Sequence, residues 1–227
     1  MNTHDVATLP SETIEKILRA IPFYKSVKKQ NEGQYQELLQ YSRIFQFNSG
    51  EQILTRGQMD SWSYFLVKGQ LVVSLPDQFG RQLHINYITP GEVFGDLAVL
   101  LKTPRTADVL VDENCREAVI FGTDFSMFGQ LLNFNIVSMD TKLIYYRHTV
   151  QTLRWKLEMY RSKYRDNNLA DLHRNNKIYS GSKGSLDELH ALYQQSVDFA
   201  KLLVEWNHEF GNLSVAEGKV PEPNIAI

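Results

Sequence analysis

The sequence predicts an α+β protein in which an antiparallel β-roll, jelly-roll-like and flanked by short helices, precedes two long helices. Short β-rich runs separated by glycine turns fill residues 44–121, which is typical of an antiparallel roll. Apolar residues then recur at steps of three and four over 135–165, without proline or glycine, and predict a long helix of coiled-coil type. A third stretch, 186–210, has an apolar face and predicts a helix that completes a C-terminal α-helical hairpin.

Composition narrows the class of protein. The 227 residues are 43% hydrophobic and 22% charged with a net charge of −2, as expected of a soluble globular protein. The single cysteine, Cys115, excludes an internal disulfide. No apolar stretch reaches the length of a membrane span, and the six histidines lack the spacing of a metal site. Neither a nucleophile elbow nor a Walker-type loop is present. We therefore expect a cytoplasmic, non-enzymatic protein without catalytic residues, metal or cofactor.

The predicted elements follow a simple order along the chain. Ser11 caps a short amphipathic helix, and residues 34–41 form a second short helix. Turn residues at 48–50 and 77–80 separate β-rich runs. The strand candidates are residues 44–47, 62–67, 71–75, 83–88, 109–111 and 118–121.

Residues 90–109 combine two glycines with a carboxylate and an arginine around one predicted helical turn, Asp96–Leu101. Gly91 and Gly95 let the backbone take positive φ and approach a ligand closely. Unpaired amides after Gly95 favour an anion, and the guanidinium of Arg105 pairs with two phosphate oxygens at once. Asp96 accepts a hydrogen bond from a sugar hydroxyl but repels a phosphate. The pattern therefore predicts a site for a ribose beside a phosphate.

Two motifs carry a resemblance to a known family: Phe94-Gly95-Asp96-Leu97-Ala98 and Pro104-Arg105-Thr106-Ala107. Together they resemble the phosphate-binding cassette of the cyclic nucleotide-binding domain family. That family includes catabolite-activator regulators, regulatory subunits of cyclic-nucleotide-dependent kinases and gated ion channels. The resemblance spans roughly Ile21 to Asn133, and the ordered set of motifs is more specific than a lone glycine pattern. It implies a roll that binds cAMP or cGMP.

The resemblance also implies a role for each matching residue. Gly95, Leu97 and Ala98 place backbone groups around the cyclic phosphate. Arg105 is the phosphate partner, and Asp96 accepts the ribose 2′-hydroxyl, although members usually have the longer glutamate there. Thr106 stands where members have Thr, Ser or Ala, which leaves both nucleotides open. The implied ligand-binding residues are Phe94, Gly95, Asp96, Leu97, Ala98, Arg105, Thr106 and Ala107.

The first long helix carries a heptad seam. In nucleotide-sensing members of the family the helix after the roll is commonly the dimer contact, so we expect a homodimer. Like charges on the flanks of the seam, such as Lys142 and Arg147, oppose a simple parallel pair of helices. The expected dimerisation residues are Ile136, Met139, Leu143, Tyr146, Val150, Leu153 and Leu157.

The second long helix complements the first in charge. Residues 142–165 contain seven Lys or Arg against one Glu, whereas 186–210 contain five acidic residues against one lysine. Ser185 and Glu188 form a capping box at the start of this acidic helix. We expect the acidic helix to pack along the basic one, in the same chain or swapped from a partner.

These expectations divide the chain into five parts and favour one function. The parts are a cyclic nucleotide-binding domain (1–133), a dimerisation helix (134–165), a linker (166–184), an acidic helix (185–211) and a flexible tail (212–227). The favoured function is a second-messenger sensor that relays nucleotide binding through a dimeric helical region to a protein partner.

Two alternatives to the sensor stay open. The first is a cyclic-nucleotide-responsive transcription regulator with an atypical C-terminal domain. The second is a scaffold whose degenerate roll binds nothing. The sequence argues against nucleic acid as a partner, because no basic recognition helix follows the long helix and residues 186–210 are acidic.

Overall fold

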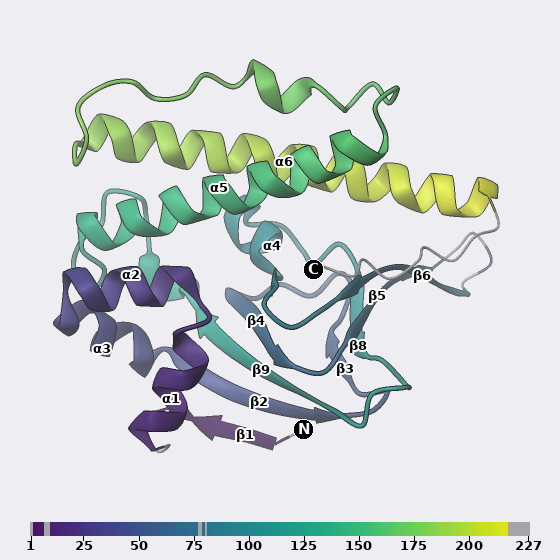
Figure 1. The fold of residues 1–227 in the computed structure, drawn as a ribbon, viewed down its shortest axis with the longest axis horizontal. Coiled ribbons are helices and arrows are strands. Elements are labelled where there is room, and N and C mark those ends of the chain that lie inside the picture. Colours follow the sequence, from purple (N-terminus) through teal and green to yellow (C-terminus); the bar gives the residue numbers. More distant parts are fainter. Residues whose placement is uncertain (1, 7–9, 77–78, 80, 218–227) are drawn as a thin grey trace.

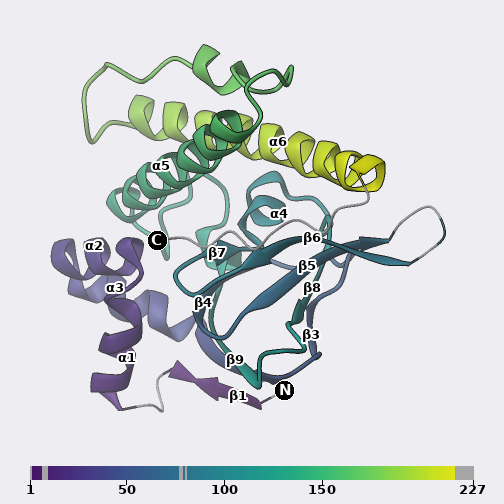
Figure 2. The ribbon, with the colours of Figure 1, turned by 45° about the vertical axis from the view of Figure 1, so that its right-hand side comes forward.

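A computed structural model describes residues 2–6, 10–76, 79 and 81–217 of the chain. Two antiparallel sheets form a roll, three short helices lie at one end of it, and two long helices cover one side (Figures 1 and 2). The roll with its flanking and C-terminal helices confirms the predicted fold class.

The strand pairs of the roll are antiparallel throughout the part of the chain that the structure describes. One sheet has the order β1-β2-β9-β4-β7 and the other β3-β8-β5-β6. Leu66, Leu71 and Ile120 fill the space between the sheets with no exposed area. The strands are Asn2–Asp5 (β1), Ser42–Asn48 (β2), Gln52–Leu54 (β3), Trp62–Lys68 (β4), Leu71–Pro76 (β5), Gln82–Ile88 (β6), Val93–Phe94 (β7), Asp108–Val111 (β8) and Glu117–Asp124 (β9).

The six predicted strands correspond to β2, β4, β5, β6, β8 and β9. Three strands, β1, β3 and β7, are absent from the prediction. Strand β1 (Asn2–Asp5) contains no apolar residue, and β3 and β7, with three and two residues, are too short for the period-2 pattern to be seen in sequence.

Three short helices join the roll to the first long helix. They are α1 (Ser11–Leu18), α2 (Pro22–Gln30) and α3 (Glu32–Gln40), and the long helix is α5 (Met139–Lys163). The buried hydroxyl of Tyr24 hydrogen-bonds Ser42 Oγ at 2.9 Å and Thr123 Oγ1 at 2.6 Å, which ties α2 to β2 and β9. Phe23 packs edge-on against Tyr145 of α5, with ring centroids 5.6 Å apart. These contacts fix α5 against the roll through α2.

The starts of three helices differ slightly from the prediction. Pro10, not Ser11, occupies the cap position of α1. The second predicted helix begins two residues early, at Glu32, because the Asn31 side chain accepts a hydrogen bond from the Gln34 amide and caps it. The long helix begins at Met139 instead of 135, because Ser138 supplies its N-terminal cap.

The last helix, α6 (Leu186–Glu217), packs along α5 of the same chain. Arg147 of α5 forms a bidentate ion pair with Glu188, and further along both helices Tyr160 packs against Trp206. Contacts therefore advance in the same direction on both helices, which run parallel instead of forming the expected hairpin. Residues 164–185 connect the two helices and run back along the outer side of α6, above it in Figure 1. A connection of this length allows the parallel arrangement.

The apolar seam of α5 is buried inside this chain. Leu143, Leu153 and Leu157 are at most 1% exposed, and Tyr146 and Val150 are 8% exposed. Tyr146 packs on Tyr193 of α6. The seam thus supplies the chain's own core, with Met139 half-buried at its edge and Ile136, before the helix, 38% exposed. A homodimer stays a prediction, and in this arrangement it requires another surface than the buried part of the seam.

Lys142 anchors the segment that links the roll to α5. Its side chain is 1% exposed, so it is not the solvated flank of a seam. Burial lowers the pKa of Lys142 to about 8. Carbonyl oxygens around the amine favour its charged form. Lys142 Nζ donates to four backbone carbonyls, those of Phe128 (2.6 Å), Gln130 (2.7 Å), Leu131 (3.1 Å) and Asn133 (2.7 Å).

The last helix is longer than predicted. The acidic helix runs to Glu217, beyond the expected end at 211, and residues 218–227 of the expected tail lie outside the described residues. The expected linker, residues 166–184, contains the short 3-10 helix η3 (Leu172–Asn175).

No helix among residues 2–6, 10–76, 79 and 81–217 is both long and apolar enough to cross a membrane.

Candidate ligand-binding site

A cavity of about 460 Å³ lies between the roll and the two long helices. Its floor comes from β5, β6 and the segment around the short helix α4 (Asp96–Leu101), and its roof comes from α5 and α6. Figures 1 and 2 show α4 between the roll and the long helices. The volume is within the range of small-molecule sites. We call this space the larger cavity.

The predicted helical turn is present with the predicted bounds, Asp96–Leu101. Gly95 precedes it with φ +75°, a left-handed conformation that favours glycine. A Cβ atom on Gly95 would lie 2.8 Å from Arg105 Nη1 and 3.3 Å from a ring carbon of Tyr64. Gly95 is therefore required by both its backbone angle and the close approach of Arg105.

Arg105 is held almost entirely by its own chain. The side chain is buried, Nε donates to Asp60 Oδ2 at 3.2 Å, and Nη2 donates to Asp60 Oδ1 and the Trp62 carbonyl. Nη1 donates to the Gly95 carbonyl. Four of the five N–H groups of the guanidinium therefore have partners, and one on Nη1 is left for a ligand. This corrects the expected two-oxygen fork: Arg105 lines the larger cavity with one donor to spare.

The carboxylate of Asp96, unlike the guanidinium of Arg105, has no partner among the described residues. Its side chain is 6% exposed and lines the larger cavity, yet no hydrogen bond or ion pair reaches its carboxylate from the described residues. A buried carboxylate without a donor is costly, because its lost hydration is not replaced. Asp96 therefore presents an acceptor that a hydroxyl group of a ligand can satisfy.

The structure brings all eight predicted ligand-binding residues to one place. Phe94, Gly95, Asp96, Leu97 and Ala98 reach the larger cavity from β7 and α4, and residues 105–107 reach it from the segment before β8. Thr106 thus lines the same space as Asp96. Their gathering follows from the fold, since residues 94–98 and 105–107 flank one helical turn.

Sequence reasoning missed the roof of the larger cavity. Trp155 and Met159 of α5 line it and are 56% and 44% exposed, unusually open for large apolar side chains. Asn207 and His208 line it from α6. A signal for the first pair exists in the sequence, because Trp155 and Met159 are four residues apart and off the heptad seam. Nothing in the sequence indicates the α6 residues.

Two further charged groups near the larger cavity were also missed. Asp60, the partner of Arg105, lies in the turn before β4, far from the cassette in sequence. Lys156 of α5 lines the cavity, and its Nζ donates to the Val93 carbonyl at 3.2 Å. Lys156 has no carboxylate within ion-pair distance among the residues described, so it contributes positive charge to the cavity from the α5 side.

Comparison with known proteins identifies the class of domain. Residues 44–130 match the family model described as cyclic nucleotide-binding domain. The recognition of this family from residues 94–98 and 104–107 is thereby confirmed. The match covers the roll except β1 and the first two residues of β2, includes the short 3-10 helix η2 (Phe125–Phe128), and ends before α5 and α6.

Curated relatives are similar over 40–48% of this chain. A putative potassium channel protein of Rhodopseudomonas palustris is 29% identical over 93 residues, 40% of this chain and 22% of the relative. The cAMP-activated global transcriptional regulator CRP of Salmonella typhimurium is 25% identical over 109 residues, 48% of this chain and 50% of the relative. The cAMP-dependent protein kinase type II regulatory subunit of Drosophila melanogaster is 26% identical over 95 residues, 42% of this chain and 24% of the relative. The aligned regions thus span at most about half of these relatives.

Among solved structures, the chain is similar to the regulatory subunit of a cAMP-independent protein kinase A from Trypanosoma brucei. The identity is 25%, the TM-score is 0.44, and the match covers 52% of this chain and 41% of that one.

Proposed function

We propose that this protein is a non-enzymatic sensor that binds a cyclic mononucleotide in the larger cavity. One observation carries the proposal: the buried carboxylate of Asp96, which has no partner among the described residues, lines the same cavity as Arg105 and the rest of the cassette. A ribose hydroxyl satisfies the carboxylate, and a neighbouring cyclic phosphate meets the remaining N–H of Arg105. The family match and the names of the relatives support the same ligand class.

The rest of the cavity suits a purine base. Trp155 presents an exposed indole at the roof, and stacking of a base on an aromatic side chain contributes about 1–3 kcal/mol. Lys156 adds a positive charge that favours an anionic ligand. Thr106 lines the cavity and suits either base, so we propose cAMP and cGMP as the two candidate ligands.

A relay through the helices follows from where the roof residues lie. Because α5 and α6 supply the roof, a ligand that contacts Trp155 or His208 changes the relative free energy of different positions of these helices. The segment that Lys142 anchors, between the roll and α5, is the place where such a change in helix position is absorbed. We propose that the output is a protein partner, or a second copy of this chain, that contacts the helical region.

A DNA-binding regulator ranks second, on the similarity to CRP over 109 residues. Three cations of the helical region are already paired with carboxylates and do not favour it. Arg147 pairs with Glu188, Arg161 with Asp171, and Arg174 with Glu158. Neutralised cations attract phosphate weakly, so they supply little of the affinity that DNA binding needs.

Calorimetric titration of the full chain with cAMP, cGMP and 5′-AMP tests the proposal. We expect saturable binding of at least one cyclic nucleotide and at least tenfold weaker binding of 5′-AMP. Asp96→Ala and Arg105→Ala should each lower the affinity at least tenfold, since each removes a buried polar contact. Asp140→Ala, at the exposed start of α5, serves as the matched control and should bind as the unmodified chain does. If no cyclic nucleotide binds, the proposal is wrong and the alternative remains that the protein is a scaffold whose roll binds nothing.

A further inference from the structure

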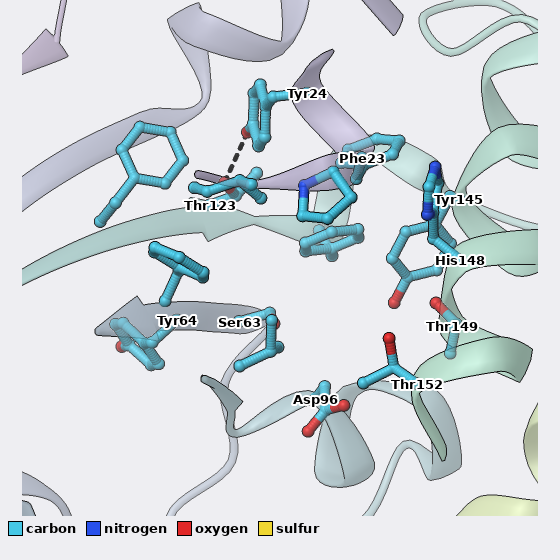
Figure 3. A pocket seen from close by; sticks show the side chains of 16 residues that line it. Phe23, Tyr24, Ser63, Tyr64, Asp96, Thr123, Tyr145, His148, Thr149 and Thr152 are labelled. Carbon is cyan, nitrogen blue, oxygen red and sulfur yellow. Dashed lines mark hydrogen bonds between the residues drawn. The ribbon is translucent and has the colours of Figure 1, made fainter. Parts of the chain in front are cut away.

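A second, smaller cavity of about 110 Å³ lies between the roll, α2 and α5. Figure 3 shows its walls. Residues at the start of α2 and on β4 and β9 form one side, and Tyr145, His148, Thr149 and Thr152 of α5 form the other. Thr152 is exposed, so this cavity opens to solvent beside α5. The cassette assignment uses none of these α5 residues.

The walls of the smaller cavity are mostly aromatic. Rings from α2, the strands, η2 and α5 surround the space and offer both faces and edges to a ligand. Several polar groups at the walls already have partners within the protein, including the hydroxyls of Tyr24 and Thr123. His148 Nε2 and Ser26 Oγ are 2.9 Å apart in a hydrogen bond, and Tyr145 shares a hydrogen bond with Thr149. The wall rings belong to Phe23, Tyr24, Tyr64, Phe65, Phe121, Phe125 and Tyr145.

Besides the hydroxyl of Tyr64, three polar groups at the smaller cavity have no hydrogen-bond partner among the described residues. They are the hydroxyls of Ser63 and Thr152 and the carboxylate of Asp96. Ser63 is 8% exposed and Asp96 is 6% exposed, so two of the three are more than nine-tenths buried. Buried polar groups are normally hydrogen-bonded, and a group that lacks a partner points to a ligand or ordered water.

The volume of the smaller cavity and the side chains that line it limit which ligands it can bind. An engineered apolar cavity of about 150 Å³ binds one benzene molecule. The smaller cavity, at about 110 Å³, therefore excludes a bicyclic molecule and holds a single ring with part of that ring at the open side. Aromatic walls favour an aromatic ring. The anionic acceptor of Asp96 requires a donor on that ring. We propose that the smaller cavity is a second ligand site for a monocyclic aromatic molecule that carries one hydrogen-bond donor, such as a phenol.

The two cavities share Asp96 and Val93, which separate them. A donor in the smaller cavity competes for the same carboxylate that the nucleotide ribose needs. Occupancy of the smaller cavity therefore weakens nucleotide binding, and by linkage the nucleotide weakens binding of the ring to the same extent. This coupling rests on the proposed function, whereas binding of the ring does not.

Titration of the full chain with phenol and with benzene, followed by ligand-observed NMR, tests the site. We expect saturable binding of phenol that is at least fivefold tighter than that of benzene. Thr152→Phe places a ring at the mouth of the cavity and should weaken phenol binding at least tenfold. Gln151→Phe is the matched control, because Gln151 is exposed on α5 and lines neither cavity. Ser63→Ala keeps the cavity and should weaken phenol binding less than Thr152→Phe does.

The coupling is measured by titrating the nucleotide at increasing phenol concentration. We expect at least a fivefold rise in the apparent Kd of the nucleotide, absent in Thr152→Phe. Non-saturable phenol binding, or equal binding by Thr152→Phe and Gln151→Phe, would overturn the site. A nucleotide Kd unchanged by saturating phenol would overturn the coupling. If no cyclic nucleotide binds at all, the proposed function and the coupling fail together, while the phenol titration still decides whether the smaller cavity is a site.

Discussion

Asp60 and Arg105 form a bidentate ion pair beside the larger cavity. Nε of Arg105 lies 3.2 Å from Asp60 Oδ2, and Nη2 bonds the other carboxylate oxygen. The side chain of Arg105 is 2% exposed and that of Asp60 is 17% exposed. The pair joins the turn before β4 to the cassette, so the guanidinium is held in place whether or not a ligand meets its remaining donor.

Asp60→Asn should destabilise the fold by about 1.5–3 kcal/mol, because it weakens charged hydrogen bonds to a buried guanidinium. Urea unfolding of the full chain measures the change. Glu117→Gln is the matched control, since the Lys68–Glu117 pair is exposed and should contribute less than about 1 kcal/mol. Equal effects of both substitutions would show that Asp60 does not hold Arg105.

Trp155→Ala should weaken nucleotide binding by about 1–3 kcal/mol, or roughly 5- to 150-fold, because it removes the stacking surface at the roof. Its side chain is 56% exposed, so the free energy of unfolding should hardly change. Calorimetry and urea unfolding separate the two effects. Leu172→Ala, at a similarly exposed apolar residue outside the larger cavity, should leave affinity unchanged. Unchanged nucleotide affinity in Trp155→Ala would show that the base does not stack on α5.

Leu153→Ala should destabilise the chain by about 2–5 kcal/mol, because Leu153 is fully buried between α5 and its neighbours. Gln151→Ala, on the exposed side of the same helix, should change stability by at most about 0.5 kcal/mol. Sedimentation of Leu153→Ala gives the second readout. If Leu153→Ala abolished a dimer without lowering the stability of the monomer, the seam would be an interface between two chains and not part of the core of one chain.

Lys142→Met should loosen the segment between the roll and α5, because it leaves buried carbonyls such as those of Phe128 and Asn133 without a donor. We expect faster amide hydrogen exchange over residues 129–138 than in the unmodified chain, with β4 and β9 less affected. Lys201→Met on the exposed side of α6 is the matched control. Unchanged exchange over 129–138 would show that the amine is dispensable.

Glu158 should make stability depend on pH in the acid range. Hydrogen bonds with His173 and then Arg174 lower the pKa of Glu158 from its ordinary 4.5 to about 2. The unfolded chain therefore binds the proton first as pH falls, and the stabilisation present above pH 4.5 is lost toward pH 2. The carboxylate is 37% exposed, so solvent screens the pair and we expect at most about 1 kcal/mol. The contribution of Glu158 is measured by urea unfolding of Glu158→Gln and of the unmodified chain. The difference between their unfolding free energies should be present at pH 6 and shrink below pH 4. A difference in unfolding free energy that stays the same from pH 6 to below pH 4 would show that ionisation of Glu158 does not cause the pH dependence.

Much of the roll and the cassette could be predicted from local pattern. Gly95, Asp96 and Arg105 lie within eleven residues, and their chemistry depends on a turn that short-range sequence specifies. The partner of the arginine could not be found in this way. Asp60 is 45 residues from Arg105, and no local pattern links a turn acid to a distant guanidinium. The same holds for Asn207 and His208, which meet the larger cavity only because α6 lies over it.

The heptad seam shows where a periodic pattern is ambiguous. An apolar stripe of this spacing specifies that a helix buries one face, but a second chain and a helix of the same chain satisfy it equally. Here α6 packs on it in parallel, as the Arg147–Glu188 pair and the Tyr160–Trp206 contact show. Charge complementarity between the two helices was visible in the sequence, whereas their relative direction was not.

The sequence by itself determined that residues 44–121 fold as an antiparallel roll, that Asp96–Leu101 is a helical turn, and that two long helices follow. These features depend on periodicity, turn chemistry and capping, which act over a few residues. Only the tertiary structure decided that α5 and α6 roof the larger cavity, that Asp60 occupies the fork of Arg105, and that Asp96 separates two cavities. Contacts of this kind join distant segments, and which segments meet is decided by burial of the whole chain rather than by any local pattern.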